Sequence, residues 1–411
     1  MPQLRYHMFS SLSKATLAKA AIFHDAPVYV QFYVTARCNL TCKQCNIIYA
    51  NSDVRECTIG EIHRIAENFA KMGVAIVLLT GGEPFARKDL PEIIAAFESR
   101  GVHVRMQTNG FATEAQIEAA IAAGGKDISI SLDTLRPDAQ DDINGGFAKS
   151  WHRALKAIAF FTQRLPKEGS FASLGCVLQP DSIGSIEDVV RFGTAIKWYT
   201  SLVPIHVSDY VHPRGFRTFD QSLRFLPSEF AAVDGVIERV RAMQREGYLL
   251  YDSDRYLEDM KRFVRGEPTT WRDKNGGVCD SPNLYFAVLP NGDFAPCCDY
   301  RLSNAASTFA PDFPNVYRDA RFRVEVKDVV SACEGCMYGS YPEITIAMRF
   351  LAAKLQRMRT FLTAPVAKDN WPLRYEQLVE IAETIRGEPR QRAKLERGKT
   401  IRFGGSNGQE D

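Results

Sequence analysis

The sequence predicts an α/β fold in which a parallel sheet, covered by helices, curls into a partial (β/α)6 TIM-like barrel. Segments rich in β-branched and aromatic residues alternate with amphipathic helical segments about six times over residues 28–210, and such alternation is typical of parallel sheets. Polar and glycine-rich motifs follow several strand segments, where parallel sheets and barrels carry their sites. A small cysteine-rich domain and C-terminal helices are expected after the barrel.

The elements can be placed in order along the chain. Residues 28–34 read Val-Tyr-Val-Gln-Phe-Tyr-Val and predict a buried first strand. Residues 58–61, Thr-Ile-Gly-Glu, form a capping-box pattern that predicts a helix start, and Gly73 is expected to end that helix. The pattern then predicts strands at 74–79, 102–107, 127–132, 171–179 and 201–207, and helices at 89–100, 113–123, 150–164 and 185–197.

Changes in composition divide the chain into six expected regions. The tail is charged and rich in glycine, so it is expected to be disordered. The regions are an N-terminal segment (1–27), the barrel core (28–210), a helical linker region (211–275), a cysteine-rich domain (276–342), C-terminal helices (343–386) and the tail (387–411).

Composition excludes several classes of protein. The chain has 51 lysines and arginines against 49 aspartates and glutamates, a net charge of +2, so no nucleic-acid partner is expected. It has no uncharged apolar run of membrane-spanning length, and its first 26 residues lack the continuous apolar core of a signal peptide. A cytoplasmic location is therefore expected, and there the ten cysteines favour metal or redox chemistry over disulfides.

The most informative motif follows the first strand. Cys38, Cys42 and Cys45 form a C-x3-C-x2-C run, and three thiolates at this spacing can hold three corners of a [4Fe–4S] cluster. The fourth iron would then be open to a small molecule that binds through its amino and carboxylate groups. A zinc loop or unrelated buried thiols are the alternatives.

Further motifs fall at the ends of later strands. Residues 81–84 read Gly-Gly-Glu-Pro, residues 107–110 read Gln-Thr-Asn-Gly, and residues 131–133 read Ser-Leu-Asp. Because the carboxyl ends of parallel strands lie at one rim, these motifs and the cysteine loop are expected to converge there.

In this combination of motifs the sequence resembles the radical SAM superfamily, whose members cleave S-adenosylmethionine (SAM) to a radical. The resemblance covers residues 28–210, but Gln44 replaces an aromatic residue that many members have, and residues 144–146 and 179–182 also depart from the family pattern. The resemblance implies that Cys38, Cys42 and Cys45 ligate the SAM-cleaving cluster, that Gly81, Gly82, Glu83 and Pro84 hold the methionine amino group, that Ser131 and Asp133 bind the ribose, and that Asn109 and Gln179 line the adenosine pocket.

A second cysteine group lies in the region after residue 276. Four thiolates can complete a fully ligated [4Fe–4S] cluster or bind structural zinc. The order and spacing resemble the twitch domain, the one-cluster form of the SPASM domain, which implies one auxiliary [4Fe–4S] cluster. The group consists of Cys279, twelve residues, Gly292, four residues and Cys297, followed by the C-x2-C pair Cys333 and Cys336.

The sequence assigns no catalytic side chain. Cys176 and Cys298 are candidates to return a hydrogen atom to a substrate radical, although buried cysteines are more often inert core residues. Cys298 could instead replace Cys297 as a cluster ligand. His206 is more simply interpreted as a hydrogen-bonded residue at the rim.

One amphipathic basic helix is predicted from Ile344 to Leu362. Its first interpretation is a helix that docks onto the protein through its apolar stripe. Peripheral membrane contact through the same helix is the alternative.

Three functions are compatible with the sequence. The first is a radical SAM enzyme that abstracts hydrogen from a small biosynthetic molecule, in a net oxidation or related modification, with flavodoxin or ferredoxin as reductant. The second is a maturase of a ribosomally made peptide; such enzymes commonly carry an N-terminal recognition domain, and only 37 residues precede Cys38. The third is a non-catalytic iron–sulfur or zinc protein, against which the motifs at 81–84 and 131–133 argue.

Overall fold

A single curved sheet organises the molecule. In this computed structural model its eight strands have the order β6-β5-β4-β3-β2-β1-β7-β8, and β1 to β6 are parallel neighbours in chain order. The predicted partial (β/α)6 barrel is thereby confirmed. The structure describes residues 19, 27–47, 54–210, 215–272, 279–331, 333, 335–362, 366–390, 392, 393 and 395.

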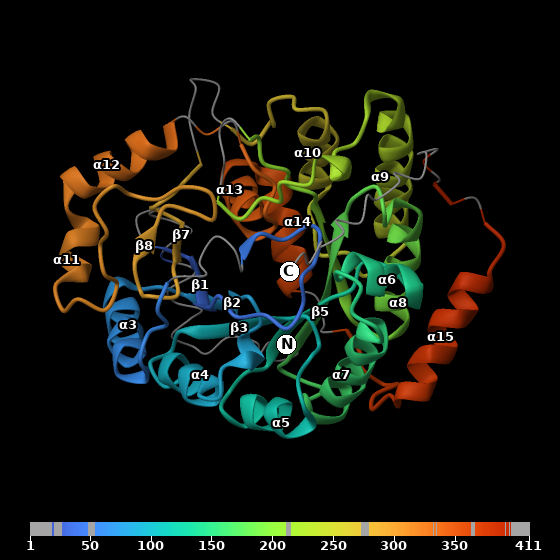
Figure 1. Cartoon of the computed structure of the whole chain (residues 1–411), viewed down its shortest axis with the longest axis horizontal. Coiled ribbons are helices and arrows are strands. Elements are labelled where there is room, and N and C mark those ends of the chain that lie inside the picture. The colour runs from blue at the N-terminus through green and yellow to red at the C-terminus, as the bar shows by residue number, and fades with distance from the viewer. Residues whose placement is uncertain are drawn as a thin grey trace, which may run out of the picture.

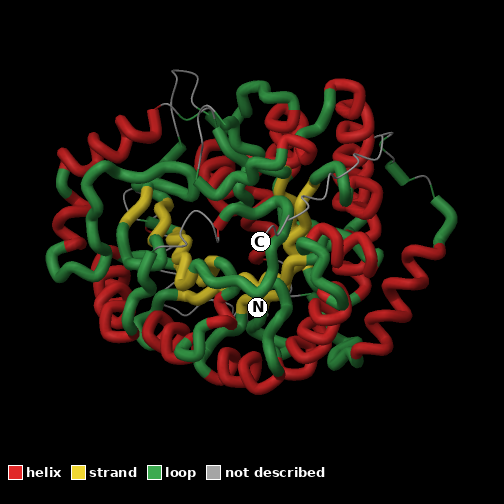
Figure 2. Tube along the Cα trace, viewed as in Figure 1, coloured by secondary structure: helices red, strands yellow, loops and turns green. Residues whose placement is uncertain are grey.

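The strands curve around the middle of the molecule, and the helices that connect β1 to β6 lie on the outer side of the sheet, whereas the helices at 340–349 and 351–362 lie within the curve (Figures 1 and 2). The strands are β1 (Tyr29–Thr35), β2 (Ile76–Gly81), β3 (His103–Thr108), β4 (Asp127–Ser131), β5 (Phe171–Leu178), β6 (Tyr199–Pro204), β7 (Tyr285–Val288) and β8 (Phe294–Ala295). The helices are α3 (Ile59–Met72), α4 (Leu90–Glu98), α5 (Glu114–Ala122), α6 (Pro137–Ile143), α7 (Ser150–Arg164), α8 (Ile186–Ala195), α9 (Phe230–Arg245), α10 (Asp254–Val264), α11 (Phe313–Arg318), α12 (Ala320–Ser331), α13 (Ser340–Arg349), α14 (Leu351–Leu362) and α15 (Tyr375–Gly387).

Local chemistry explains where the first crossover helix starts and stops. The Thr58 hydroxyl accepts a hydrogen bond from the Glu61 amide, and the Glu61 carboxylate accepts one from the Thr58 amide at 2.8 Å. Gly73 ends α3 in the left-handed conformation, with a φ of 79°. The predicted capping box and helix end are both confirmed.

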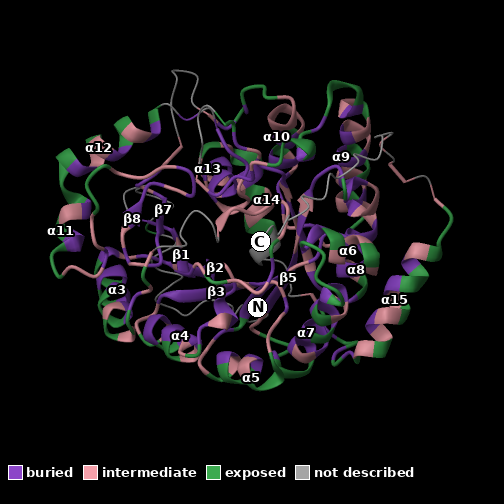
Figure 3. Ribbon diagram, viewed as in Figure 1, coloured by how far each residue is buried: buried purple, intermediate pink, exposed green. Residues whose placement is uncertain are grey.

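The two faces of the sheet have different environments. On β1, Val30, Phe32 and Val34 belong to the main hydrophobic core, which packs between the sheet and the helices. The alternate residues Gln31 and Tyr33 line a cavity inside the barrel, as the two-residue period of a strand requires. Figure 3 shows the strands buried and the outward faces of the helices exposed.

The cysteine-rich region contributes two strands to the barrel sheet. β7 pairs in parallel with β1, and β8 pairs antiparallel with β7 to close a hairpin. The sequence predicts a separate domain over 276–342, but this hairpin covers the edge that β1 would otherwise expose. The second cysteine group is therefore attached directly to the sheet that carries the first.

The prediction of a single helix from Ile344 to Leu362 is wrong, because the chain forms two helices there, α13 and α14. Phe350 adopts an extended conformation (φ −119°, ψ 116°) between α13 and α14, so the predicted apolar stripe is broken. Leu351, Leu355 and Met358 of α14 are 71%, 55% and 47% exposed. Membrane contact through these residues stays a prediction. Among the described residues, no helix combines the length and the apolar character that crossing a membrane requires.

The first residues of the predicted tail contact α8, and the expectation of disorder stays a prediction. Arg392 donates a hydrogen bond to the Asp188 carboxylate at 2.9 Å, and Arg390 pairs with the same carboxylate at 3.3 Å. Residues 396–411, and residues 1–18 and 20–26 of the N-terminal segment, lie outside the described residues.

Candidate functional site

The first cysteine loop follows β1 at the carboxyl end of the barrel strands. The thiols of Cys38, Cys42 and Cys45 lie close enough to interact electrostatically with one another. The Leu40 amide approaches the Cys38 sulfur at 3.4 Å and the Asn109 side-chain amide approaches it at 3.6 Å. The three predicted ligands therefore lie near one another and beside Asn109, which the resemblance implies lines the adenosine pocket.

These thiols suit a cationic group. Burial raises the pKa of all three, that of Cys45 to about 11, because a buried thiolate without a countercharge is unfavourable. An iron–sulfur cluster would supply that charge by binding the deprotonated sulfurs. Within the described part of the chain, no three His, Cys, Asp or Glu residues are gathered as a site for a single metal ion.

The turn at residues 81–84 packs against the start of the cysteine loop. The Gly82 amide donates to the Thr35 carbonyl and the Glu83 amide donates to the Arg37 carbonyl, both at 2.8 Å. Gly81 has a φ of 141°, and a Cβ at Gly82 would lie 2.2 Å from the Arg37 carbonyl oxygen. Glycine is required here because the two backbone segments are in direct contact.

We expect Gly82→Ala to reduce SAM-dependent activity by about a hundredfold, since displacing a site residue by an ångström has effects of that size. Relief of the backbone clash moves the turn away from the cysteine loop. The matched control is Gly60→Ala on α3, where no atom lies within 4 Å of the new Cβ. Unchanged 5′-deoxyadenosine formation by Gly82→Ala would contradict this role of the turn.

Glu83 connects the ends of β2 and β3. Its buried carboxylate accepts hydrogen bonds from the Phe85 amide at 3.0 Å, the Thr108 hydroxyl at 2.8 Å and the Asn109 amide at 2.8 Å. Burial nevertheless raises the pKa of Glu83 to about 7. The hydrogen bond from the backbone amide of Asn109 thereby holds this residue beside the cysteine loop. Pro84 begins a 3₁₀ turn and is buried with Phe85.

Ser131 and Asp133, which the resemblance implies bind the ribose, both line the cavity. One Asp133 oxygen accepts from the Val177 amide at 2.7 Å and the other from the Gln44 side chain at 3.3 Å. Burial raises the pKa of Asp133 to about 6. Gln179 is not among the residues that line this cavity. It is 1% exposed, and its side-chain amide has no hydrogen-bond partner among the described residues.

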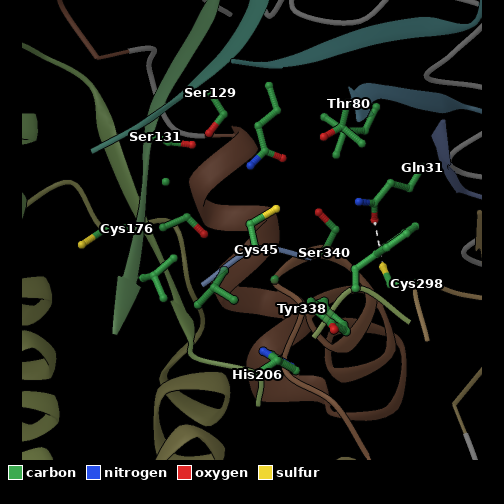
Figure 4. Close-up of a pocket in the computed structure, with 18 of the residues that line it drawn as sticks. Gln31, Cys45, Thr80, Ser129, Ser131, Cys176, His206, Cys298, Tyr338 and Ser340 are labelled. Atoms are coloured by element: carbon green, nitrogen blue, oxygen red, sulfur yellow. Dashed lines mark hydrogen bonds between the residues drawn. The ribbon is translucent and has the colours of Figure 1, made fainter. Parts of the chain in front are cut away.

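The barrel interior contains a cavity of about 300 Å³ with wall residues from all six barrel strands. Cys45 reaches its mouth, and Ser129, Ser131 and Thr80 surround it from the sheet (Figure 4). Cys298 also faces it: the thiol approaches the Gln31 side-chain oxygen at 3.7 Å.

The structure argues against Cys176 as a hydrogen donor. Cys176 lines the cavity together with its neighbours Gly175 and Val177, but strand alternation turns its side chain toward the opposite face of the sheet. That side chain belongs to the hydrophobic core, and its thiol points to the Asp133 carbonyl at 3.7 Å, away from the middle of the cavity (Figure 4). Of the two candidates, Cys298 is the one whose thiol faces the cavity.

The second cysteine group also comes together. The structure distinguishes the roles of Cys297 and Cys298. The thiol of Cys297 interacts electrostatically with Cys279 and Cys336, whereas the thiol of Cys298 faces the cavity. Amide groups donate to two of these sulfurs, Asp299 N–H to Cys297 at 3.4 Å and Gly335 N–H to Cys333 at 3.3 Å. Cys279 and Cys336 each interact electrostatically with both Cys297 and Cys333 and with each other.

Residues 215–218, here called the strap, lie between the two cysteine groups. Arg217 forms an isolated β-bridge with Cys45, and a Cβ on Gly215 would lie 2.2 Å from the Cys298 carbonyl oxygen. The Arg217 guanidinium pairs with the buried Asp299 carboxylate at 2.7 Å, and the Tyr338 hydroxyl donates to the same carboxylate at 2.9 Å. Sequence reasoning missed this contact, because the strap lies in a loop without any periodic pattern.

His206 is a hydrogen-bonded residue of the cavity wall. Its Nε2 accepts from the Met337 amide at 3.0 Å, so Nδ1 carries the proton and donates to the Pro204 carbonyl at 2.7 Å. Its ring stacks on Tyr338 with centroids 3.9 Å apart. Burial and the nearby Arg217 lower its pKa well below the usual value, so His206 stays neutral.

Asp252 lies deep in the cavity wall. It accepts from the Ser201 hydroxyl at 2.8 Å and the Leu202 amide at 2.6 Å. Burial raises its pKa to about 7, the neighbouring Glu343 adds to that rise, and Arg357 opposes it. The folded protein therefore holds a proton on Asp252 that the unfolded chain releases near its ordinary pKa of about 4.

This proton makes the stability depend on pH. The titration of Asp252 should lower the free energy of unfolding as the pH rises from about 4 to about 7, and Asp252→Asn should remove this contribution. Relative to wild type, the variant should gain on the order of 2–4 kcal/mol between pH 4 and pH 8. Chemical denaturation at both pH values measures this. Asp254→Asn is the control of opposite sign, because hydrogen bonding to Arg241 lowers the pKa of Asp254; parallel curves for wild type and Asp252→Asn would contradict the account.

Comparison with known proteins agrees with this geometry. Residues 32–193 match the Radical SAM superfamily, and this part of the chain is a radical SAM domain. The family implies SAM and a SAM-binding [4Fe–4S] cluster, which the first cysteine loop and the turn at 81–84 fit.

Individual relatives match over only part of their length. A GTP 3′,8-cyclase of Tolumonas auensis is 36% identical over 113 residues, 26% of this chain and 34% of that protein. The mycofactocin maturase MftC of Mycobacterium ulcerans is 27% identical over 179 residues, 42% of this chain and 47% of that protein. The chain thus matches less than half of the length of either curated relative.

The fold extends beyond the matched segment. A crystal structure of Streptococcus suis SuiB bound to its precursor peptide SuiA superposes with a TM-score of 0.57 and 20% identity, over 79% of this chain and 75% of that chain. At this identity the similarity shows the fold alone.

Proposed function

We propose that the protein is a radical SAM enzyme that reductively cleaves SAM and abstracts hydrogen from a small-molecule substrate, in a net oxidation or related modification. One observation supports the proposal: Cys45, Ser131 and Asp133 line one cavity, and the turn at 81–84 is hydrogen-bonded to residues 35 and 37 at the start of the cysteine loop. A site that cleaves SAM needs these groups together, because the sulfonium must lie against the cluster while the ribose is held.

The chain's own residues would position the reactants. Cys38, Cys42 and Cys45 would hold the cluster, which when bound supplies the low-potential electron for homolytic cleavage of SAM. Asp133, fixed by the Val177 amide, is available at the cavity edge to orient a ribose hydroxyl.

An auxiliary [4Fe–4S] cluster is part of the proposal. Cys279, Cys297, Cys333 and Cys336 would hold it, and their group lies across the strap from the SAM loop. An electron acceptor beside the cavity supports a net oxidation of the substrate. A low-potential reductant such as flavodoxin or ferredoxin is the proposed partner, and a cytoplasmic location stays a prediction.

A second candidate function is the maturation of a ribosomally made peptide. It is favoured by the names of two similar proteins, a mycofactocin maturase and a structure that holds a precursor peptide. The substrates of the two candidates differ in size and chemistry, which the cavity wall can distinguish.

The experiment that tests the proposal is an anaerobic incubation of reconstituted full-length protein with SAM and dithionite, with 5′-deoxyadenosine measured by chromatography. Wild type and the control Cys57→Ala, a buried cysteine outside both groups, should form it. Cys42→Ala should form none. No product from wild type would favour the third function, a non-catalytic iron–sulfur or zinc protein.

A further inference from the structure

The cavity wall points to the class of substrate. We propose that the barrel interior binds a small, neutral, polyhydroxylated molecule through Thr80, Gln107 and Ser129, a set of residues called the polar band below. This inference rests on the proposed function, because it assigns a substrate class to the same site.

The polar band lies on three consecutive strands, one layer deeper than the residues assigned to SAM. Thr80 of β2 precedes Gly81, Gln107 of β3 lies two residues before Asn109, and Ser129 of β4 lies two residues before Ser131. Gln107 and Ser129 are register partners. Neighbouring strands are about 4.8 Å apart, a separation comparable to that of hydroxyl groups across a six-membered ring.

Thr80 and Ser129 are buried and Gln107 is half-buried, but the described part of the chain supplies no hydrogen-bond partner for these side chains. Thr80 and Ser129 are 6% and 9% exposed, and both face the cavity (Figure 4). Within the residues that the structure describes, the side chains of Thr80, Gln107 and Ser129 have no hydrogen-bond partner. Their polar atoms are not fully enclosed by the protein and face the cavity, so a ligand with several hydroxyl groups is the complementary occupant.

The charges on the cavity wall argue for a neutral ligand. Arg105 pairs with Asp127 at 3.6 Å and donates to the Ser173 hydroxyl at 3.1 Å. Glu343 pairs with Arg357 at 2.7 Å. In the described part of the wall, Arg105 and Glu343 therefore have ion-pair partners, and Asp133 and Asp252 accept hydrogen bonds from the chain. Among these described wall residues, no unpaired cation is offered to a phosphate or a carboxylate.

The size and the apolar part of the wall complete the argument. A cavity of about 300 Å³ lies at the lower end of the range for small-molecule sites, which suits one ring better than a peptide segment. Tyr33 and Phe216, whose ring centroids are 4.5 Å apart, line the same cavity with aromatic surface. The C–H faces of a sugar or cyclitol ring would pack against it.

Binding of defined probes tests this substrate class. Reconstituted full-length protein with SAM is examined by ligand-observed NMR with myo-inositol, D-glucose and N-acetylglucosamine, and with a capped tripeptide. We expect at least one polyol to bind, and Thr80→Val, Gln107→Leu and Ser129→Ala each to weaken that binding about three- to tenfold. Ser99→Ala is the control, since the Ser99 hydroxyl bonds within α4, and it should bind as wild type does.

The inference is overturned if no polyol binds, or if the tripeptide binds and the band variants weaken that binding instead. Equal polyol binding by wild type and all band variants also overturns it. The 5′-deoxyadenosine assay on the same samples separates the two proposals. Product without polyol binding leaves the proposed function standing and removes the substrate class, whereas no product removes the proposed function itself.

Discussion

Replacing Cys38, Cys42 and Cys45 together with alanine is expected to halve the iron content of the reconstituted protein, from about eight to about four iron atoms. The two cysteine groups are separate in the chain but attached to one sheet, through β1 and through the β7–β8 hairpin. Each group should therefore assemble its own cluster. Iron and acid-labile sulfide, measured after anaerobic reconstitution, give the result directly.

The same triple variant should form no 5′-deoxyadenosine, while Cys176→Ala, which removes a core thiol, should keep both clusters. A triple variant without any iron would show that the second group binds no iron–sulfur cluster. Zinc analysis of that group would then be the next measurement, since its four thiolates also suit structural zinc. Eight irons in the triple variant would contradict the assignment of the first loop.

Arg217→Met is expected to destabilise the protein by about 3–5 kcal/mol, because it leaves the Asp299 carboxylate buried without its cation. The side chains of Arg217 and Asp299 are 9% and 2% exposed and are 2.7 Å apart. The strap lies against both cysteine loops, so the loss should also disturb cluster retention. Denaturant unfolding of the reconstituted protein measures the first effect and iron content the second.

Arg136→Met is the matched control. Arg136 and Asp138 form an ion pair at 3.2 Å whose side chains are 62% and 75% exposed, and exposed pairs contribute little. The account requires a large difference between the two variants. Equal, small losses would mean that the Arg217 pair is not what holds the strap, and Asp299→Asn should then also have little effect.

Much of the barrel could be predicted because its signals are local. Period-two strands and a capping box are properties of short segments, and they located β1 to β6 and the start of α3. The convergence of the cysteine loop with residues 81–84 and 131–133 followed from one rule, that parallel strands end at one rim. The structure brings these motifs together as that rule requires.

The remaining features depend on contacts between distant segments. β7 has only four residues, too few for a periodic pattern, and its pairing with β1 joins segments about 250 residues apart. The face of the sheet on which the Cys176 side chain lies depends on strand register. The break at Phe350 divides an otherwise continuous helical pattern. Arg217 and Asp299 carry no motif, so only the fold reveals that they join the two cysteine groups.

The most direct test of the central claim is the electron paramagnetic resonance spectrum of the reduced first cluster, recorded with and without SAM. The sample is a variant with alanine at Cys279, Cys297, Cys333 and Cys336, so that the SAM-loop cluster is the one observed. The account predicts that SAM changes the spectrum, because it binds the iron that has no cysteine ligand. An identical spectrum with and without SAM, in protein that retains about four irons, would contradict the assignment of this site.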